Sequence, residues 1–354
     1  MTPARIVLAA LALAVTVGLI AAPFSLKPYG IYILTLWAVT TITAIGLNLT
    51  LGYAGQVSLA QGAFVGIGAY AAALLTTKGW PLAAAYPVAG VACFAIGWLL
   101  GYPALRVQHH YLAFVTLAFA TLVYLVFRNE EWITGGIYGI SGIPRPSLFG
   151  WSLRAPRDFY YFCLANLAVV AFAAWWLIRS PWGRAFVALR ENPVRALSLG
   201  VDTRRYTLMA FALGAALGGI SGVLYAPLVQ YVDPTPFSLV LSFNLLLMVV
   251  VGGSGRFFGP FLGAMVAVLL PEWLQAADNM YGVFGPLADA ARAVLPPEVP
   301  KYVAKHYLIA YAVFVMVLMT FSPGGIIGLV ARRFAGAPAR KPPAAAPAAA
   351  EAAS

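Results

Sequence analysis

The sequence predicts an all-α polytopic membrane protein, a bundle of about ten transmembrane helices, some of them broken or re-entrant. Of its 354 residues, 62% are hydrophobic and only 9% are charged, whereas a soluble domain carries about 25% charged residues. The charges lie in short clusters. The stretches between them are about 15 to 25 residues long, close to the roughly 20 apolar residues that cross a bilayer. These observations exclude an ordinary soluble fold.

Ten apolar segments follow one another along the chain. The third, eighth and ninth are short or rich in glycine, which is typical of half-helices in transporters. The ten segments are residues 6–22, 29–51, 57–75, 83–105, 111–127, 159–178, 206–230, 237–252, 257–272 and 307–321.

The distribution of Lys and Arg predicts the orientation of the spans, because cytoplasmic loops carry more of these residues. The connection 179–205 holds six arginines against two acidic residues, and the stretch after the last span is also cationic. Four spans separate these two regions, so both can face the cytoplasm. We therefore expect cytoplasmic N- and C-termini, with loops of about 128–158 and 273–306 outside. The net charge of +11 then reflects topology, and no nucleic-acid partner is expected.

The two ends of the chain are interpreted separately. Segment 6–22 could instead be a cleaved signal peptide, because one basic residue precedes it and small residues end it. Cleavage would leave the later spans oriented as before. Residues 335–354 are rich in Pro and Ala and are expected to form a disordered cytoplasmic tail, so that residues 1–334 form the membrane domain.

The spans contain no acidic residue near their centres, where a carboxylate usually marks an ion pathway. This disfavours a transporter driven by an ion gradient alone, although backbone carbonyls and hydroxyls can also coordinate sodium. The histidines and cysteines lack neighbours at ligand spacing, which argues against a metal site and against an intramembrane enzyme. No G-x-x-x-x-G-K-[ST] loop occurs, so we expect no cofactor on this chain and ATP only on separate subunits.

Two regions interrupt the apolar sequence with glycine and polar residues. They are Gly46–Leu75 and Asn244–Leu270, and each contains a G-x-x-G step. Paired interruptions in two halves of a transporter indicate a pathway near the bilayer midplane. The alternative is that the small residues only let helices pack closely. The candidate pathway residues are Asn48, Gln56, Ser58, Gln61, Gly252, Gly253 and Ser254.

The connection 179–205 is long enough for two short helices that are broken near Pro193. Its arginines could simply set the orientation or contact anionic lipid. The other interpretation is a docking surface for a cytoplasmic motor, in which a short helix ended by glycine presents apolar side chains to a groove. The candidate docking residues are Arg190, Glu191, Arg195, Ala196, Leu197, Leu199 and Gly200.

Five sequence stretches occur in a fixed order. They are GLNLTLGYAGQVSLAQGAF with GIGAY (46–70), TGGIYGISGIPRP (134–146), SPWGRAFVALRENPVRALSLGVDTRRYTLMAF (180–211), SGVLYAPLVQYVDPTPFSLVLSFNLLLMVVVGGSGRFFGPFLGA (221–264) and FSPGGIIGL (321–329). Together they resemble the permease subunits of branched-chain amino-acid ABC importers, in particular the LivM type.

The resemblance implies an inner-membrane permease, not an enzyme, that moves branched-chain or other amino acids inward. It implies three kinds of partner besides lipid: a homologous second permease, two cytoplasmic ATP-binding subunits and an extracytoplasmic substrate-binding protein. Residues 184–203 then correspond to the family's coupling segment, with Arg195 where alanine is usual. Residues 275–305 are longer than the family's usual connection. A urea, short-amide or other small-carboxylate permease and an ion-coupled transporter stay open as alternatives.

Overall fold

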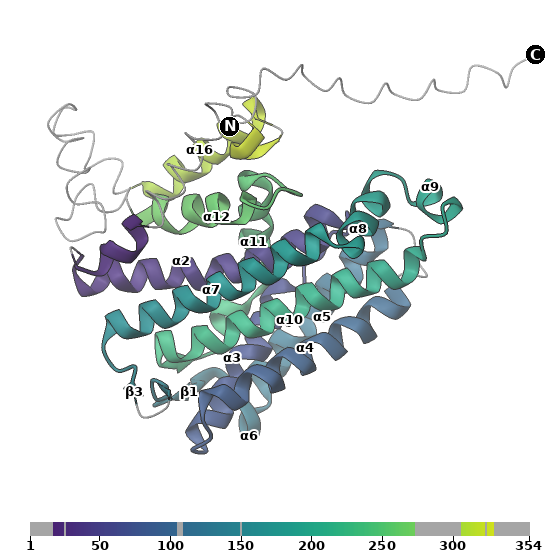
Figure 1. The fold of residues 1–354 in the computed structure, drawn as a ribbon. Helices are drawn as coiled ribbons and strands as arrows, with labels where there is room; N and C mark the ends of the chain where they lie inside the picture. The colour runs from purple at the N-terminus through teal and green to yellow at the C-terminus, as the bar shows by residue number, and fades with distance from the viewer. Residues whose placement is uncertain are drawn as a thin grey trace, which may run out of the picture.

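The computed structural model describes residues 17–24, 26–104, 109–148, 151–272, 306–322 and 324–328. The described chain is almost entirely helical, as Figure 1 shows. Within these described ranges, five helices are long and apolar enough to cross a membrane, namely Pro28–Tyr53, Leu82–Tyr102, Leu112–Asn129, Pro156–Arg179 and Thr203–Val229. The structure therefore confirms the predicted all-α membrane bundle.

The helices follow the predicted segments. The longer ones in chain order are α2 (Pro28–Leu47), α3 (Gln61–Thr77), α4 (Leu82–Ala104), α5 (His109–Asn129), α7 (Pro156–Arg179), α8 (Pro181–Glu191), α10 (Thr203–Val229), α11 (Leu239–Gly252) and α16 (Tyr307–Phe321). The short ones are η1 (Asn48–Tyr53), α6 (Glu131–Thr134), η2 (Gly136–Tyr138), α9 (Pro193–Ser198), η3 (Thr235–Phe237), α12 (Gly259–Ala264) and η4 (Met265–Leu269).

Some predictions fall on residues that the structure does not describe. Of the first predicted span, 6–22, only the end is described, and residues 17–24 are helical. The predicted tail, 335–354, and the long connection at 275–305 lie outside the described residues.

Local signals start the helices of the arginine-rich connection. Pro181 and Pro193 stand in the first turn of α8 and α9, where a missing amide proton costs nothing. The side chains of Ser180, Asn192 and Asp202 accept hydrogen bonds from backbone amides at the starts of α8, α9 and α10. The two short helices predicted for this connection are therefore present.

Helix α10 is the centre of the bundle and packs against α2, α3 and α4. Small residues let the backbones touch. A Cβ atom added at Gly68 of α3 would lie 1.9 Å from the carbonyl oxygen of Gly219, and one added at Gly222 would lie 2.0 Å from the carbonyl oxygen of Val65. Close backbone approach of this kind is how helices pack in lipid, where burial of apolar surface gives no advantage.

The two ends of the bundle carry different structures. Figure 1 shows α8 and α9 at one end and α6, β1 and β3 at the other. Helix α7 connects these ends with 24 residues, a length of about 36 Å at 1.5 Å per residue. The arginine-rich connection and the loop 128–158 therefore lie at opposite ends, as the charge distribution predicts.

Short strands order the end that carries α6. β1 (Ile140–Ser141) pairs antiparallel with β4 (Tyr231–Val232), and β2 (Ser147–Leu148) pairs with β3 (Trp151–Ser152). Gly139, just before β1, has a φ of 62°, and a Cβ there would lie 2.3 Å from the carbonyl oxygen of Val232. Only glycine fits this contact.

We predict that Gly68→Ala lowers the stability of the chain by about 1–3 kcal/mol, the usual cost of overpacking. The added methyl group collides with the backbone of α10, so α3 and α10 must move apart. The matched control is Gly90→Ala in α4, where the nearest atom lies 3.9 Å from the new Cβ. The measurement is the thermal unfolding midpoint in detergent, and equal midpoints for the two variants would contradict the tight contact.

Candidate functional site

The first glycine-rich region interrupts the α-helix at the end of α2, and we call residues 48–60 the first break. Asn48–Tyr53 form a π-helix, and residues 54–60 are non-helical before α3 begins at Gln61. The amide of Gln56 donates to the carbonyl oxygen of Thr50 at 2.9 Å. In an α-helix this amide would bind the carbonyl of residue 52 instead. The span predicted at 57–75 therefore starts only at residue 61, because its first residues belong to the break.

The second glycine-rich region separates α11 from α12. Gly253 and Gly255 have φ angles of 114° and 73°, which bulkier residues rarely adopt. A Cβ added at Gly325 would lie 2.5 Å from the Cα atom of Gly253. The described part of the C-terminal glycine-rich stretch, at Gly325, therefore packs directly on this second break.

Asn48 joins the two breaks. Its Oδ1 accepts a hydrogen bond from the amide of Gly255 at 2.9 Å, and its Nδ2 donates to the carbonyl oxygen of Arg256 at 3.1 Å. The side chain is only 3% exposed. A Cβ at Gly52 would lie 2.0 Å from Oδ1 of Asn48 and 2.4 Å from the amide nitrogen of Gly255, so the two breaks meet with no room for a larger residue.

The other predicted pathway residues bind the chain's own backbone. Gln61 is buried and donates from Nε2 to the carbonyl oxygen of Gly214 in α10 at 3.0 Å. Gln56 and Ser58 bond to the backbone within their own turns. The structure thus brings Asn48 against Gly255 and Arg256, which directly follow Gly252, Gly253 and half-buried Ser254 in the second break. It places Gln61 apart from them, between α2 and α10.

Two further hydroxyls serve the first break and were missed from the sequence. Oγ1 of Thr116 in α5 accepts from the amide of Leu59, and Oγ of Ser242 in α11 accepts from the amide of Gly62, each at 3.0 Å. The sequence signal for either residue is a hydroxyl within an apolar helix. Such a hydroxyl often bonds to its own helix, so its distant partner is not predictable from the residue type.

Helix α9 presents an apolar surface. Leu197 and Leu199 are 61% and 81% exposed, and so is Val194, at 77%, which was missed from the sequence although it stands three residues before Leu197. We call these three residues the apolar triad. The helix ends as predicted, since Gly200 adopts a φ of 82° and its amide and that of Val201 bond back to carbonyls of α9.

Two predicted docking residues make contacts within the chain: Ala196 is buried, whereas Arg190 is exposed but bonds to the first break. Ala196 is 2% exposed because it lies on the side of α9 that packs on α10. Arg190 directs its guanidinium group to the first break, where Nη1 donates to the carbonyl oxygen of Gly52. Glu191 and Arg195 are exposed like Arg190, but no hydrogen bond within the described part of the chain ties their side chains to a helix break, so they and the apolar triad are the residues offered to a partner.

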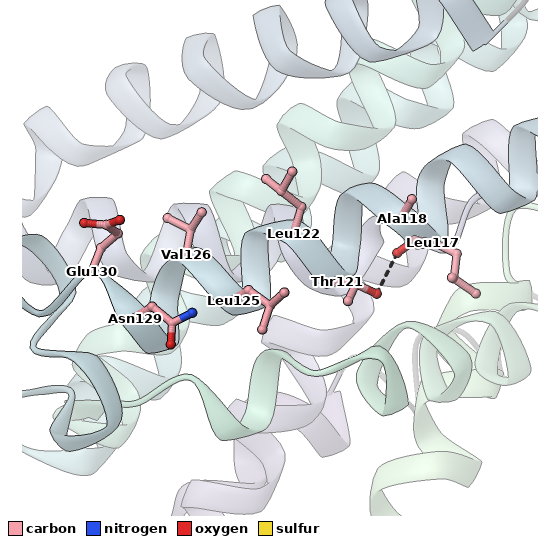
Figure 2. A pocket seen from close by; sticks show the side chains of 8 residues that line it. All are labelled: Leu117, Ala118, Thr121, Leu122, Leu125, Val126, Asn129 and Glu130. Atoms are coloured by element: carbon pink, nitrogen blue, oxygen red, sulfur yellow. Dashed lines mark hydrogen bonds between the residues drawn. The ribbon is translucent and has the colours of Figure 1, made fainter.

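An open groove of about 540 Å³ runs along the outer face of α5. Figure 2 shows Leu122, Leu125 and Val126 projecting from the helix along it, with Asn129 and Glu130 at one end. The opposite face of α5 carries Thr116. All eight lining residues come from this helix and its end, and they are Leu117, Ala118, Thr121, Leu122, Leu125, Val126, Asn129 and Glu130.

Metal ions are held by grouped His, Cys, Asp or Glu side chains. Among the residues that the structure describes, no three or more His, Cys, Asp or Glu side chains come together as metal ligands would. Cys93 and Cys163 are both buried in apolar surroundings. What the described residues do show is a pair of helix breaks joined by hydrogen bonds, together with an exposed apolar surface on α9.

Most of the chain matches one protein family. Residues 29–318 fit the family described as "Branched-chain amino acid transport system / permease component". The chain belongs to this family. The resemblance to LivM-type permeases is thereby confirmed, and so is the expectation of a transport component and not an enzyme.

Individual relatives agree with the family. The chain is 36% identical over 280 residues to the high-affinity branched-chain amino acid transport system permease protein LivM of Escherichia coli strain K12, covering 72% of this chain and 66% of that protein. It is 36% identical over 287 residues to LivM of Salmonella typhimurium, covering 74% and 68%. It is 26% identical over 239 residues to LsrC of Escherichia coli O157:H7, an autoinducer 2 import system permease protein, covering 62% and 66%.

The chain spans about two thirds of the length of these curated relatives. No solved structure matches it.

We predict that Asn48→Ala loosens the contact between the breaks. The variant removes two hydrogen bonds, each worth about 1 kcal/mol, so a cysteine introduced as Ser254→Cys reacts about thirtyfold faster with a membrane-impermeant thiol reagent. The native cysteines are buried and give little background. The labelling is measured in vesicles of both orientations, with reaction expected from the side that carries α8 and α9.

The matched control for this experiment is Asn166→Ala combined with Ser254→Cys. Asn166 donates only to the carbonyl oxygen of Phe162 in its own helix, at 2.8 Å, so its loss leaves the breaks joined. Equal labelling rates in the Asn48 and Asn166 variants would show that Asn48 does not hold the loop.

Proposed function

We propose that this chain is one permease subunit of an inner-membrane ABC importer that moves branched-chain or other amino acids into the cell. ATP is hydrolysed on separate cytoplasmic subunits. The observation that carries the proposal is the apolar triad on a capped, short helix that leads through α8 to the two helix breaks. The names of the LivM relatives support amino acids as cargo. LsrC is named for a different cargo, so membership of the family does not by itself define the substrate.

The apolar triad suits the ATP-binding subunits. Three large apolar side chains on one short helix at the end of a bundle lose contact with water when a partner's groove covers them. The Schellman-type bonds at Gly200 fix the helix end. The apolar triad therefore keeps its conformation when a bound partner displaces α9. Arg195 and Glu191 are exposed beside the triad. They can form the polar rim that surrounds the apolar centre of a protein interface.

The opposite end suits an external substrate-binding protein. Trp132 and Tyr138 are 83% and 80% exposed on a loop that is held in place. Oγ1 of Thr134 donates to carbonyl oxygens of Phe127 and Glu130 at 2.7 and 2.8 Å, and β1 pairs with β4. Exposed aromatic side chains on a rigid loop are frequent in protein interfaces.

The groove on α5 suits the second permease and the pathway. Its apolar wall is interrupted by Thr121 and Asn129, with Glu130 at the end. A polar substrate cannot travel along a helix face that lipid covers, so a homologous chain must close the groove. The other face of α5 binds the first break through Thr116, which links the groove to the segment that must move.

ATP can change the conformation only if the ATP-binding subunits bind ATP more tightly in one arrangement of the permeases than in the other. We therefore expect uptake by proteoliposomes that hold the whole complex to require ATP and the external binding protein. Uptake continues when an uncoupler abolishes the ion gradient at constant ATP. Collapse of uptake under the uncoupler would instead support an ion-coupled secondary transporter.

We predict that Leu197→Glu weakens the binding of the ATP-binding subunits by about tenfold or more, as for a central apolar contact. A carboxylate placed in an apolar groove loses its hydration without a partner. The control is Leu197→Met, which keeps the volume and apolar character. Co-elution of the subunits with the tagged chain is measured in mild detergent. If the ATP-binding subunits co-elute fully with the Leu197→Glu variant, the docking surface does not lie on α9.

A further inference from the structure

We propose that Arg190 is a positioning residue that couples α8 and α9 to both helix breaks, and not a contact for the ATP-binding subunits. This inference rests on the proposed function, since it names the residue through which a push on the apolar triad reaches the pathway. It is carried by three features of the structure: a freed carbonyl, two glycines that leave room for the side chain, and an apolar anchor on the same helix.

The freed carbonyl belongs to Gly52. The π-helix redirects the amide of Gln56 to Thr50, which leaves the carbonyl oxygen of Gly52 without its α-helical donor. Nη1 of Arg190 donates to this oxygen from a helix 138 positions further along the chain. The guanidinium group thus completes the hydrogen bonding of the first break.

Two glycines make room for Arg190. A Cβ added at Gly255 in the second break would lie 1.9 Å from Nη1 of Arg190. A Cβ added at Gly55, where φ is 72°, would lie 3.2 Å from Cγ of Arg190. The guanidinium group therefore lies against Gly255 while it binds Gly52, and one side chain contacts both breaks at the place where Asn48 joins them.

An apolar anchor makes α8 move with the first break. Phe186 is fully buried in a cluster with Leu49, Tyr53, Ala54 and Ala210. Because close-packed side chains do not slide past one another freely, a displacement of α8 carries the π-helix with it. Arg190 then transmits the same displacement to Gly255 across the contact between the breaks.

The chemistry of the contact suits a transport cycle. The acceptor on Gly52 is a neutral carbonyl, which binds a cation less strongly than a carboxylate would, so the bond can open and form again. Lysine keeps the charge but lacks the planar fork that touches both breaks. Glutamine loses the charge and is too short to reach both.

The test uses the complete complex, purified with its ATP-binding subunits and reconstituted with the external binding protein. It compares Arg190→Gln with the native chain and measures ATP hydrolysed per substrate molecule imported. We expect the subunits to co-elute normally and ATP hydrolysis to stay within about twofold, while uptake falls by about tenfold or more. The ratio of ATP to substrate rises accordingly, and Arg190→Lys restores only part of the coupling.

Two matched variants separate coupling from folding and docking. Arg184→Gln removes an exposed arginine from the same helix and should leave the ratio unchanged. Gly255→Ala keeps Arg190 and the whole cytoplasmic surface, but its methyl group displaces the guanidinium group and the Gly52 carbonyl that it binds, and it should uncouple the complex as Arg190→Gln does. Thermal unfolding midpoints of all variants are measured alongside.

The outcomes are distinct. Loss of the ATP-binding subunits from Arg190→Gln, with an unaltered ratio in Gly255→Ala, would overturn the inference and make Arg190 a docking residue. An unaltered ratio in both variants would overturn it as well. If the native complex contains no ATP-binding subunits, or imports without ATP, the proposed function itself fails, which is seen before any variant is compared.

Discussion

A helix that breaks inside a bilayer frees backbone amides and carbonyls, and no water is present there to bind them. The polar side chains of this bundle lie where that constraint places them. Thr116 and Ser242 bind amides of the first break and of the helix that follows it, and Gln61 binds a carbonyl of α10. Asn48 binds one amide and one carbonyl of the second break, and Arg190 binds the carbonyl that the π-helix releases.

The same constraint limits how such a permease selects its cargo. Side chains that hold the breaks together have their hydrogen-bonding groups occupied by backbone, and Asn48 and Gln61 are almost fully buried. A substrate that passes between the breaks must exchange these bonds for its own, and such contacts are short-lived. In the proposed importer, the external binding protein therefore selects the substrate. The groove on α5 then needs only a few polar groups among its apolar residues.

Local signals made α8 and α9 predictable, because Pro193 and Gly200 restrict the backbone by themselves. The length and apolar character of the segments likewise predicted the spans. The direction of single side chains was not predictable. Ala196 turns inward on a helix too short to show a periodic pattern. Asn48 finds its partners 207 and 208 positions away, a pairing that depends on how the whole bundle packs and that no spacing in the sequence reveals.

The two breaks also have different neighbours. The first is anchored by Phe186 to α8, and the second carries the C-terminal stretch through the contact of Gly253 with Gly325. Between them lie hydrogen bonds and bare glycine backbone instead of interdigitated side chains. Interdigitated cores resist separation because every contact must be lost at once, whereas a few hydrogen bonds can be exchanged one at a time. The glycines at this contact therefore allow both the tight closure that the structure has and the repeated opening that import requires.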